Sequence, residues 1–121
     1  MIKMSKGVKI TILALTVAFG FVLVASHSWA GDAAKGEKVF KANCVVCHGD
    51  KGDGKGPAAA PLTPKPKNFT DANEMKGIDD ARLKKSIMEG RPGTAMVSFA
   101  KTLSAGDIED VTAYIKTLLK K

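Results

Sequence analysis

Two thiols and an imidazole stand close together in the run Cys44-Val45-Val46-Cys47-His48, which follows the pattern C-x-x-C-H. This spacing is typical of the attachment site for a c-type haem, in which the two thiols add to the two vinyl groups of one porphyrin. The adjacent imidazole then reaches the iron from one face. We therefore expect one covalently bound haem c per chain, attached through Cys44 and Cys47, with His48 as an axial ligand of the iron.

Other uses of two closely spaced thiols fit this chain less well. A thioredoxin-like redox pair belongs to a βαβ unit, but the residues around Cys44 show helical spacing and no convincing strand. A structural zinc site needs four ligands, usually in two separated pairs, whereas Cys44 and Cys47 are the only cysteines. A disulfide between them remains a minor alternative, because it leaves His48 without a role.

The first thirty residues have the three parts of a secretory signal peptide. A basic segment with three lysines precedes an almost entirely apolar run over residues 10–25, and small residues occupy positions 28 and 30. We expect cleavage after Ala30, which divides the chain into a signal peptide (1–30) and one periplasmic domain (31–121) without stable membrane association. The competing interpretation is an uncleaved anchor, for which this run is shorter than the roughly 20 residues of a membrane span.

Removal of this segment changes the charge and the possible ligands of the chain. The full sequence carries 19 basic and 12 acidic residues, a net charge of +7. Three of the lysines precede residue 31, which leaves a net charge of +4 for the mature chain. His27 is lost as well, so His48 is the only histidine that remains. The small positive surplus, with no basic patch interleaved with aromatic residues, argues against nucleic-acid binding.

Three helices and one long loop have to position the haem. The predicted helices, each with its N-terminal capping residue, are 33–43 (Asp32), 80–89 (Asp79) and 105–119 (Ser104, with Asp107 completing a capping box). Residues 49–68 are rich in Gly, Pro and Lys without a hydrophobic period, which indicates an irregular loop. A mature chain of this size buries only a modest core by itself. We therefore expect an all-α fold whose core is completed by the haem.

The second axial position decides whether the iron carries electrons or binds small ligands. Three methionines of the mature chain could supply a thioether ligand. Met88 lies beside Ile87 in a predicted helix and is interpreted as core filler, while Met75 sits in a polar run with no apolar neighbour to seal a haem pocket. Met96 follows a Gly/Pro loop and precedes Phe99, whose ring can close the pocket. We predict Met96 as the sixth ligand, with a lysine amine or an open iron as the alternatives.

Over most of residues 31–121 the chain resembles the class I monohaem c-type cytochromes, the small soluble bacterial cytochromes c. The resemblance rests on the C-x-x-C-H motif together with Gly36, Phe40, Gly56-Pro57, Met96 and Tyr114. It implies the cytochrome c fold, with three or more helices wrapped around the haem. It also implies that the Pro57 carbonyl is the partner of His48, and that Gly36 and Phe40 meet the helix of Tyr114. Val97 departs from the pattern, because a proline usually follows the methionine.

These expectations lead to a periplasmic one-electron carrier rather than an enzyme. Two filled axial sites let the iron cycle between Fe(III) and Fe(II) with little rearrangement, and a His/Met pair favours the ferrous form. We expect a monomer that docks transiently with redox protein partners. One alternative is a haem protein with an open sixth site, which binds a small ligand or reduces peroxide. The other is an electron-entry subunit of a larger redox enzyme.

Overall fold

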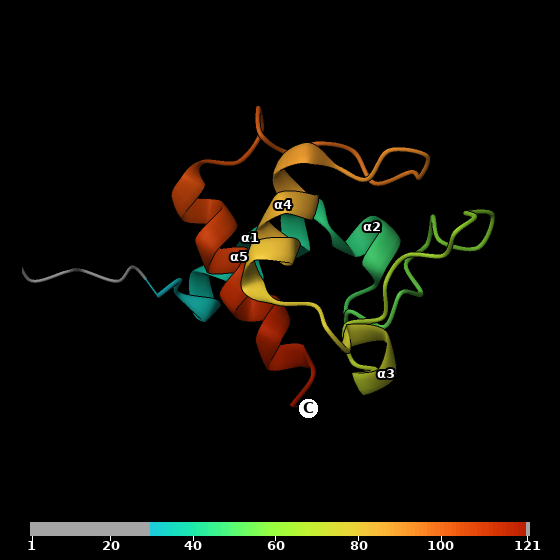
Figure 1. The fold of residues 1–121 in the computed structure, drawn as a ribbon, viewed down its shortest axis with the longest axis horizontal. Coiled ribbons are helices and arrows are strands. Elements are labelled where there is room, and N and C mark those ends of the chain that lie inside the picture. The colour runs from blue at the N-terminus through green and yellow to red at the C-terminus, as the bar shows by residue number, and fades with distance from the viewer. Residues whose placement is uncertain (1–29, 121) are drawn as a thin grey trace, which may run out of the picture.

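The computed structural model describes residues 30–120, which form an all-α architecture (Figure 1). Its helices are α1 (Ala33–Asn43), α2 (Val45–His48), α3 (Ala72–Met75), α4 (Asp80–Glu89) and α5 (Ala105–Leu118). Within residues 30–120 there is no strand, and no helix is long and apolar enough to cross a membrane. The predicted signal peptide, apart from Ala30, lies outside the described residues. The three long helices match the predicted ranges to within one residue.

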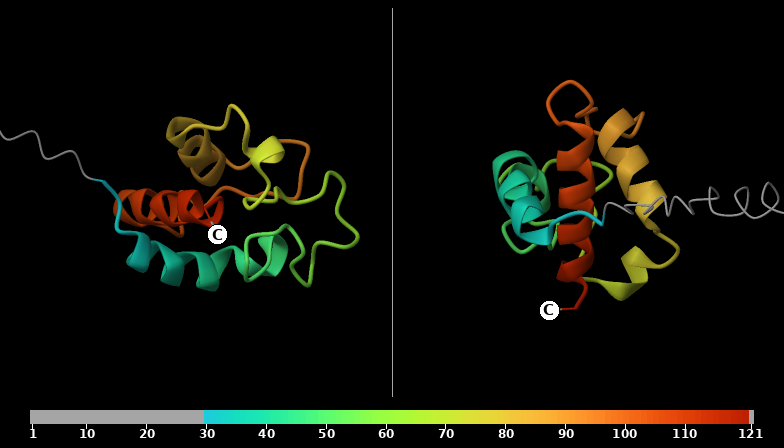
Figure 2. Two further views of the ribbon diagram at one scale, coloured as in Figure 1. Left: turned by 90° about the horizontal axis from the view of Figure 1, so that it is seen from below. Right: turned by 90° about the vertical axis from the view of Figure 1, so that its left-hand side faces the viewer.

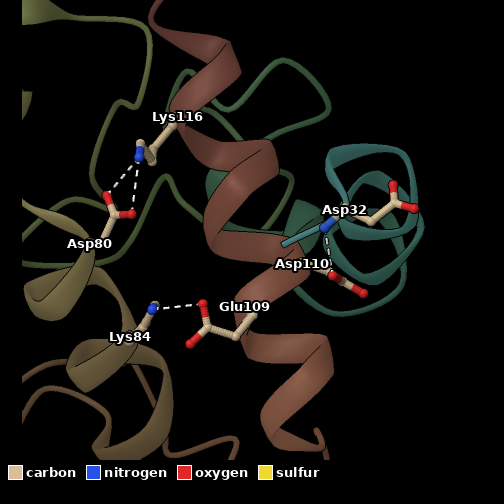
Figure 3. A network of polar contacts seen from close by, with 6 residues as sticks. All are labelled: Asp32, Asp80, Lys84, Glu109, Asp110 and Lys116. Carbon is tan, nitrogen blue, oxygen red and sulfur yellow. Dashed lines mark hydrogen bonds and ion pairs between the residues drawn. The ribbon is translucent and has the colours of Figure 1, made fainter. Parts of the chain in front are cut away.

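Helices α1 and α5 lie against each other and form the base of the core (Figure 2). The Asp32 carboxylate caps α1 by accepting a hydrogen bond from the Ala34 N–H at 2.9 Å. The Asp32 N–H in turn donates to the Asp110 carboxylate of α5 at 2.7 Å (Figure 3). Gly36 is buried, and a Cβ atom there would overlap the Asp110 carbonyl oxygen. The expected contact between Gly36 and the last helix is confirmed, and it requires glycine.

Phe40 lies at the centre of the core, where its side chain is fully buried. Its ring centroid is 5.3 Å from that of Tyr114 on α5 and 6.2 Å from that of Phe69 in the loop before α3. Helix α5 starts with the predicted capping box between Ser104 and Asp107. The core cluster comprises Phe40, Phe69, Met75, Leu83, Ile87, Ile108, Val111, Tyr114, Ile115 and Leu118.

Two ion pairs join α4 to α5 across the surface of the molecule (Figure 3). The Lys84 ammonium lies 2.7 Å from the Glu109 carboxylate, and the Lys116 ammonium lies 2.9 Å from that of Asp80. Because all four side chains are at least partly exposed, each pair contributes little to stability. The buried apolar side chains of α4, which join the core cluster, are what holds the two helices together.

Two methionines occupy environments opposite to those predicted from the sequence. Met88, predicted to fill the core, is 46% exposed, because it follows the buried Ile87 and successive helical residues point about 100° apart. Met75 is 8% exposed and belongs to the core cluster. The short helix α3, capped by Asp71, brings it there. A helix of one turn is too short to leave a periodic signal in the sequence.

Candidate haem-binding site

The last four residues of the C-x-x-C-H motif form helix α2, with Cys44 as its N-cap, and the loop that follows folds back over it. Gly49 ends the helix with a φ of 82°, in the left-handed region that favours glycine. The Gly56 N–H donates to the Cys47 carbonyl at 3.1 Å, and the Ala58 N–H donates to the Val46 carbonyl at 2.9 Å. These bonds satisfy carbonyls that a helix end leaves without a partner. The loop is therefore fixed directly against the motif.

Both cysteines are free thiols and partly buried. Burial raises the pKa of Cys44 to about 11, with a smaller contribution from the nearby Cys47 thiol. Cys44 also packs against the core cluster. At neutral pH it is therefore a protonated thiol rather than a reactive thiolate. Two thiols at the start and in the body of one short helical turn suit thioether formation, in which each S–H adds across a vinyl double bond and no oxidant is consumed.

The His48 imidazole is held on two sides by residues from the loop before α3. Its Nδ1 atom lies 3.0 Å from the Lys67 carbonyl oxygen, to which an Nδ1–H donates. The ring stacks on Phe69, with centroids 4.6 Å apart and planes inclined by 21°. Burial lowers the pKa of His48, although the hydrogen bond to Lys67 opposes this shift. A neutral ring that donates from Nδ1 keeps its lone pair on Nε2, the form that binds a metal.

The structure assigns the carbonyl partner of His48 differently from the resemblance. The expected partner was Pro57, which is an exposed residue of the loop, whereas Nδ1 contacts the Lys67 carbonyl. The path of the loop gives the reason. The Phe69 N–H donates to the Gly52 carbonyl at 2.7 Å, and this bond brings the segment from Lys67 to Phe69 beside the imidazole.

Met96 and Phe99 are both partly buried and pack against the same core cluster as Cys44. The segment that follows α4 and carries Met96 lies at the same end of the molecule as α2 and the long loop (Figures 1 and 2). The motif residues and the segment that carries Met96 therefore lie at one end of the fold. The opposite end of α1 carries none of them.

The side chains gathered at this end match the donor set of a c-type haem. They supply two thiols, an imidazole with a free Nε2 and one thioether, and the last two are the axial pair of many cytochromes. Val46 and Val97 flank these donors and are 54% and 62% exposed, as large apolar side chains that a flat apolar group can cover. Among the described residues, no group of three or more His, Cys, Asp and Glu side chains could hold a bare metal ion.

Sequence reasoning missed two residues of this site, Lys67 and Phe69. Lys67 acts through its backbone carbonyl, so the identity of its side chain carries no signal. Phe69 lies 21 positions after His48 in a loop without hydrophobic period. Its only signal is that it is an aromatic residue in a polar loop, where burial has to come from a long-range contact.

Comparison with known proteins identifies relatives along most of the chain. The family model for cytochrome c matches residues 33–119. Cytochrome c6 of Gloeothece citriformis is 39% identical over 112 residues, which cover 93% of each chain. The cbb3-type cytochrome c oxidase subunit FixP of Bradyrhizobium diazoefficiens is 40% identical over 87 residues, 72% of this chain. That match spans only 28% of FixP.

A solved structure shares the fold. Cytochrome c6 from the diatom Phaeodactylum tricornutum matches 74% of this chain and 97% of its own, with a TM-score of 0.59 and 23% identity. The fold of the described residues is therefore also the fold of a known protein.

Proposed function

The chain belongs to the cytochrome c family, and from that premise we propose that it is a periplasmic one-electron carrier whose haem c is held by His48 and Met96. Covalent haem and electron transport are properties of the family. The axial pair is supported by one observation, the environment of the three methionines that the sequence left as candidates. Met75 is buried in the core and Met88 is exposed on α4, whereas Met96 is partly buried in a segment that lies at the same end of the molecule as α2.

The residues of the chain divide the work of holding the cofactor. Cys44 and Cys47 attach it covalently, which fixes its position relative to α2. His48 offers Nε2 as one axial ligand while the Lys67 carbonyl and the Phe69 ring hold the imidazole in place. Met96 would supply its thioether as the second ligand, and the partly buried Phe99 would help to exclude water. The bound haem supplies the Fe(III)/Fe(II) couple that carries the electron.

Electron transfer needs a partner surface as well as a redox centre. The long loop carries exposed lysines that could steer acidic redox partners into a small, transient contact. They are Lys51, Lys55, Lys65 and Lys67, with Lys101 in the segment after Phe99. Steering of this kind weakens with ionic strength. An association rate that is unchanged between low and high salt would exclude it.

The periplasmic location rests on the signal peptide predicted for residues 1–30. Export also suits the chemistry, because c-type attachment uses two thiols in a compartment that otherwise oxidises such pairs. The measurement is the mass of the protein isolated from the periplasm. We expect the mass of residues 31–121 plus one haem. A mass that includes residues 1–30 would identify an uncleaved anchor.

The similarity to FixP favours one second candidate, an electron-entry subunit of a larger enzyme. FixP is by its name an oxidase subunit, and the matching part is 28% of its length. A free carrier elutes from a sizing column as a monomer after gentle extraction. A subunit instead co-purifies with an enzyme in stoichiometric amount.

The experiment that tests the ligation is the absorption spectrum of the purified ferric protein. We expect the weak near-infrared band that arises from sulfur-to-iron charge transfer. This band should disappear in Met96→Ala and persist in Met88→Ala, a matched control that removes an exposed methionine. If wild-type protein lacks the band and its ferrous form binds carbon monoxide rapidly, the sixth site is open and the carrier function is refuted.

A further inference from the structure

The segment that carries Met96 also completes the C-terminal end of α4. The last carbonyls of a helix have no partner within it. Here the Phe99 N–H donates to the Ile87 carbonyl at 2.9 Å, and the Ser98 hydroxyl donates to the Met88 carbonyl. The two residues that follow Val97 are therefore bonded to the end of α4. The position of this segment depends on that helix.

A second set of bonds fixes the backbone of Met96 itself. The Thr94 hydroxyl donates to the Arg91 carbonyl at 2.7 Å and accepts the Met96 N–H at 3.1 Å. The Met96 carbonyl accepts the Arg91 N–H at 2.9 Å. Both polar backbone groups of Met96 are thus occupied by the turn over residues 91–94. One side chain, that of Thr94, links the two halves of this turn.

Gly90 allows the two sets of bonds to form at the same place. Its φ is 71°, and a Cβ atom there would lie 2.7 Å from the Met96 carbonyl oxygen and 2.8 Å from the Ser98 nitrogen. The backbone of residues 96–98 therefore lies directly on the residue that ends α4. Only a glycine permits this approach.

We propose that Thr94 and Ser98 are positioning residues that hold Met96 in place for the iron. They supply the rigidity that a proline after the methionine would provide and that Val97 does not. Both residues are exposed and neither belongs to the core cluster, so packing does not explain their contacts. The inference rests on the His48/Met96 ligation proposed above.

The test measures how often Met96 leaves the iron, with imidazole as the probe. Exogenous imidazole binds ferric iron only when the sixth position is open, so its apparent Kd falls as the open fraction rises. Thr94→Val removes the hydroxyl at nearly constant volume, and Ser98→Ala removes the other. Loss of one such hydrogen bond should tighten imidazole binding about threefold to tenfold in each variant. Thr94→Ser keeps a hydroxyl at this position and should bind imidazole with the wild-type Kd.

Controls separate positioning from general stability and from failure of the ligation. Thr102→Val, an exposed threonine in the turn after Phe99, should leave the Kd unchanged. If Thr94→Val and Ser98→Ala lower the urea midpoint but leave the imidazole Kd at its wild-type value, their role is structural and the proposal is overturned. A wild-type ferric protein without the sulfur-to-iron band overturns the ligation and this inference together. If the wild-type protein has the sulfur-to-iron band but the imidazole Kd of both variants equals that of the wild type, this inference alone is overturned.

Discussion

Replacement of Gly36 by alanine should destabilise the protein, although alanine is the better helix former. In an isolated helix the change would stabilise by about 1 kcal/mol. In the folded protein the new Cβ atom would overlap the Asp110 carbonyl and lie 2.9 Å from the Tyr114 Cβ. The obstacle is the backbone of α5, which has no rotamer to change. Either α1 or α5 has to move.

The size of the effect follows from that displacement. A shift of about 1 Å forfeits up to roughly half of the dispersion energy between facing atoms, and overpacking of this kind costs about 1–3 kcal/mol. Because the overlap is with backbone, we take the upper end and subtract the gain in helix propensity. The net loss is about 2 kcal/mol, which corresponds to a Tm decrease of about 8–16 °C for a domain of this size.

The assay is urea and thermal unfolding of the ferric holoprotein, followed by far-ultraviolet circular dichroism at pH 7. Gly106→Ala is the matched control, because Gly106 is also helical and a Cβ there would meet only the Ser104 hydroxyl at 3.8 Å. We expect it to be neutral or to stabilise by up to about 1 kcal/mol. A Gly36→Ala protein as stable as the wild type would refute the reasoning. Equal losses in both variants would show that the α1–α5 contact is not the cause.

Three further substitutions test the core, the pH dependence and the surface. Phe40→Ala removes the fully buried ring and should cost about 3–5 kcal/mol in urea unfolding; a loss below 1 kcal/mol would show that Phe40 is not central. Hydrogen bonds from Ser104 lower the pKa of the Asp107 carboxyl, so its contribution is present above the unfolded-state pKa of about 3.9 and disappears as the pH falls through the folded value. Asp107→Asn should therefore lower the Tm at pH 7 and converge on wild type in acid; a difference independent of pH would contradict this linkage. Lys116→Ala breaks the exposed pair with Asp80 and should change the unfolding free energy by less than about 1 kcal/mol, whereas a larger loss would mean that this pair does hold α4 on α5.

The sequence allowed the long helices and the attachment motif to be predicted because both are local. Asp32, Asp79 and Ser104 each cap the helix that begins at the next residue, and these bonds span two or three positions. The contacts that were missed or assigned differently span longer distances. The Lys67 carbonyl lies 19 positions from His48, and nothing in its side chain marks it. Met75 is buried by a one-turn helix, and Met88 is exposed because its neighbour Ile87 takes the inward position.

The same distinction separates the two axial ligands of the proposed site. His48 directly follows Cys47, so covalent attachment alone keeps it near the iron whatever the rest of the chain does. Met96 lies 48 positions further along and depends on hydrogen bonds to α4 and to its own turn. Since a tenfold change in an equilibrium corresponds to about 1.4 kcal/mol and one hydrogen bond is worth about 0.5–1.5 kcal/mol, loss of two of these bonds should change the open fraction by about tenfold or more. Weakening the end of α4 should therefore raise the fraction of molecules in which Met96 has left the iron before the core unfolds.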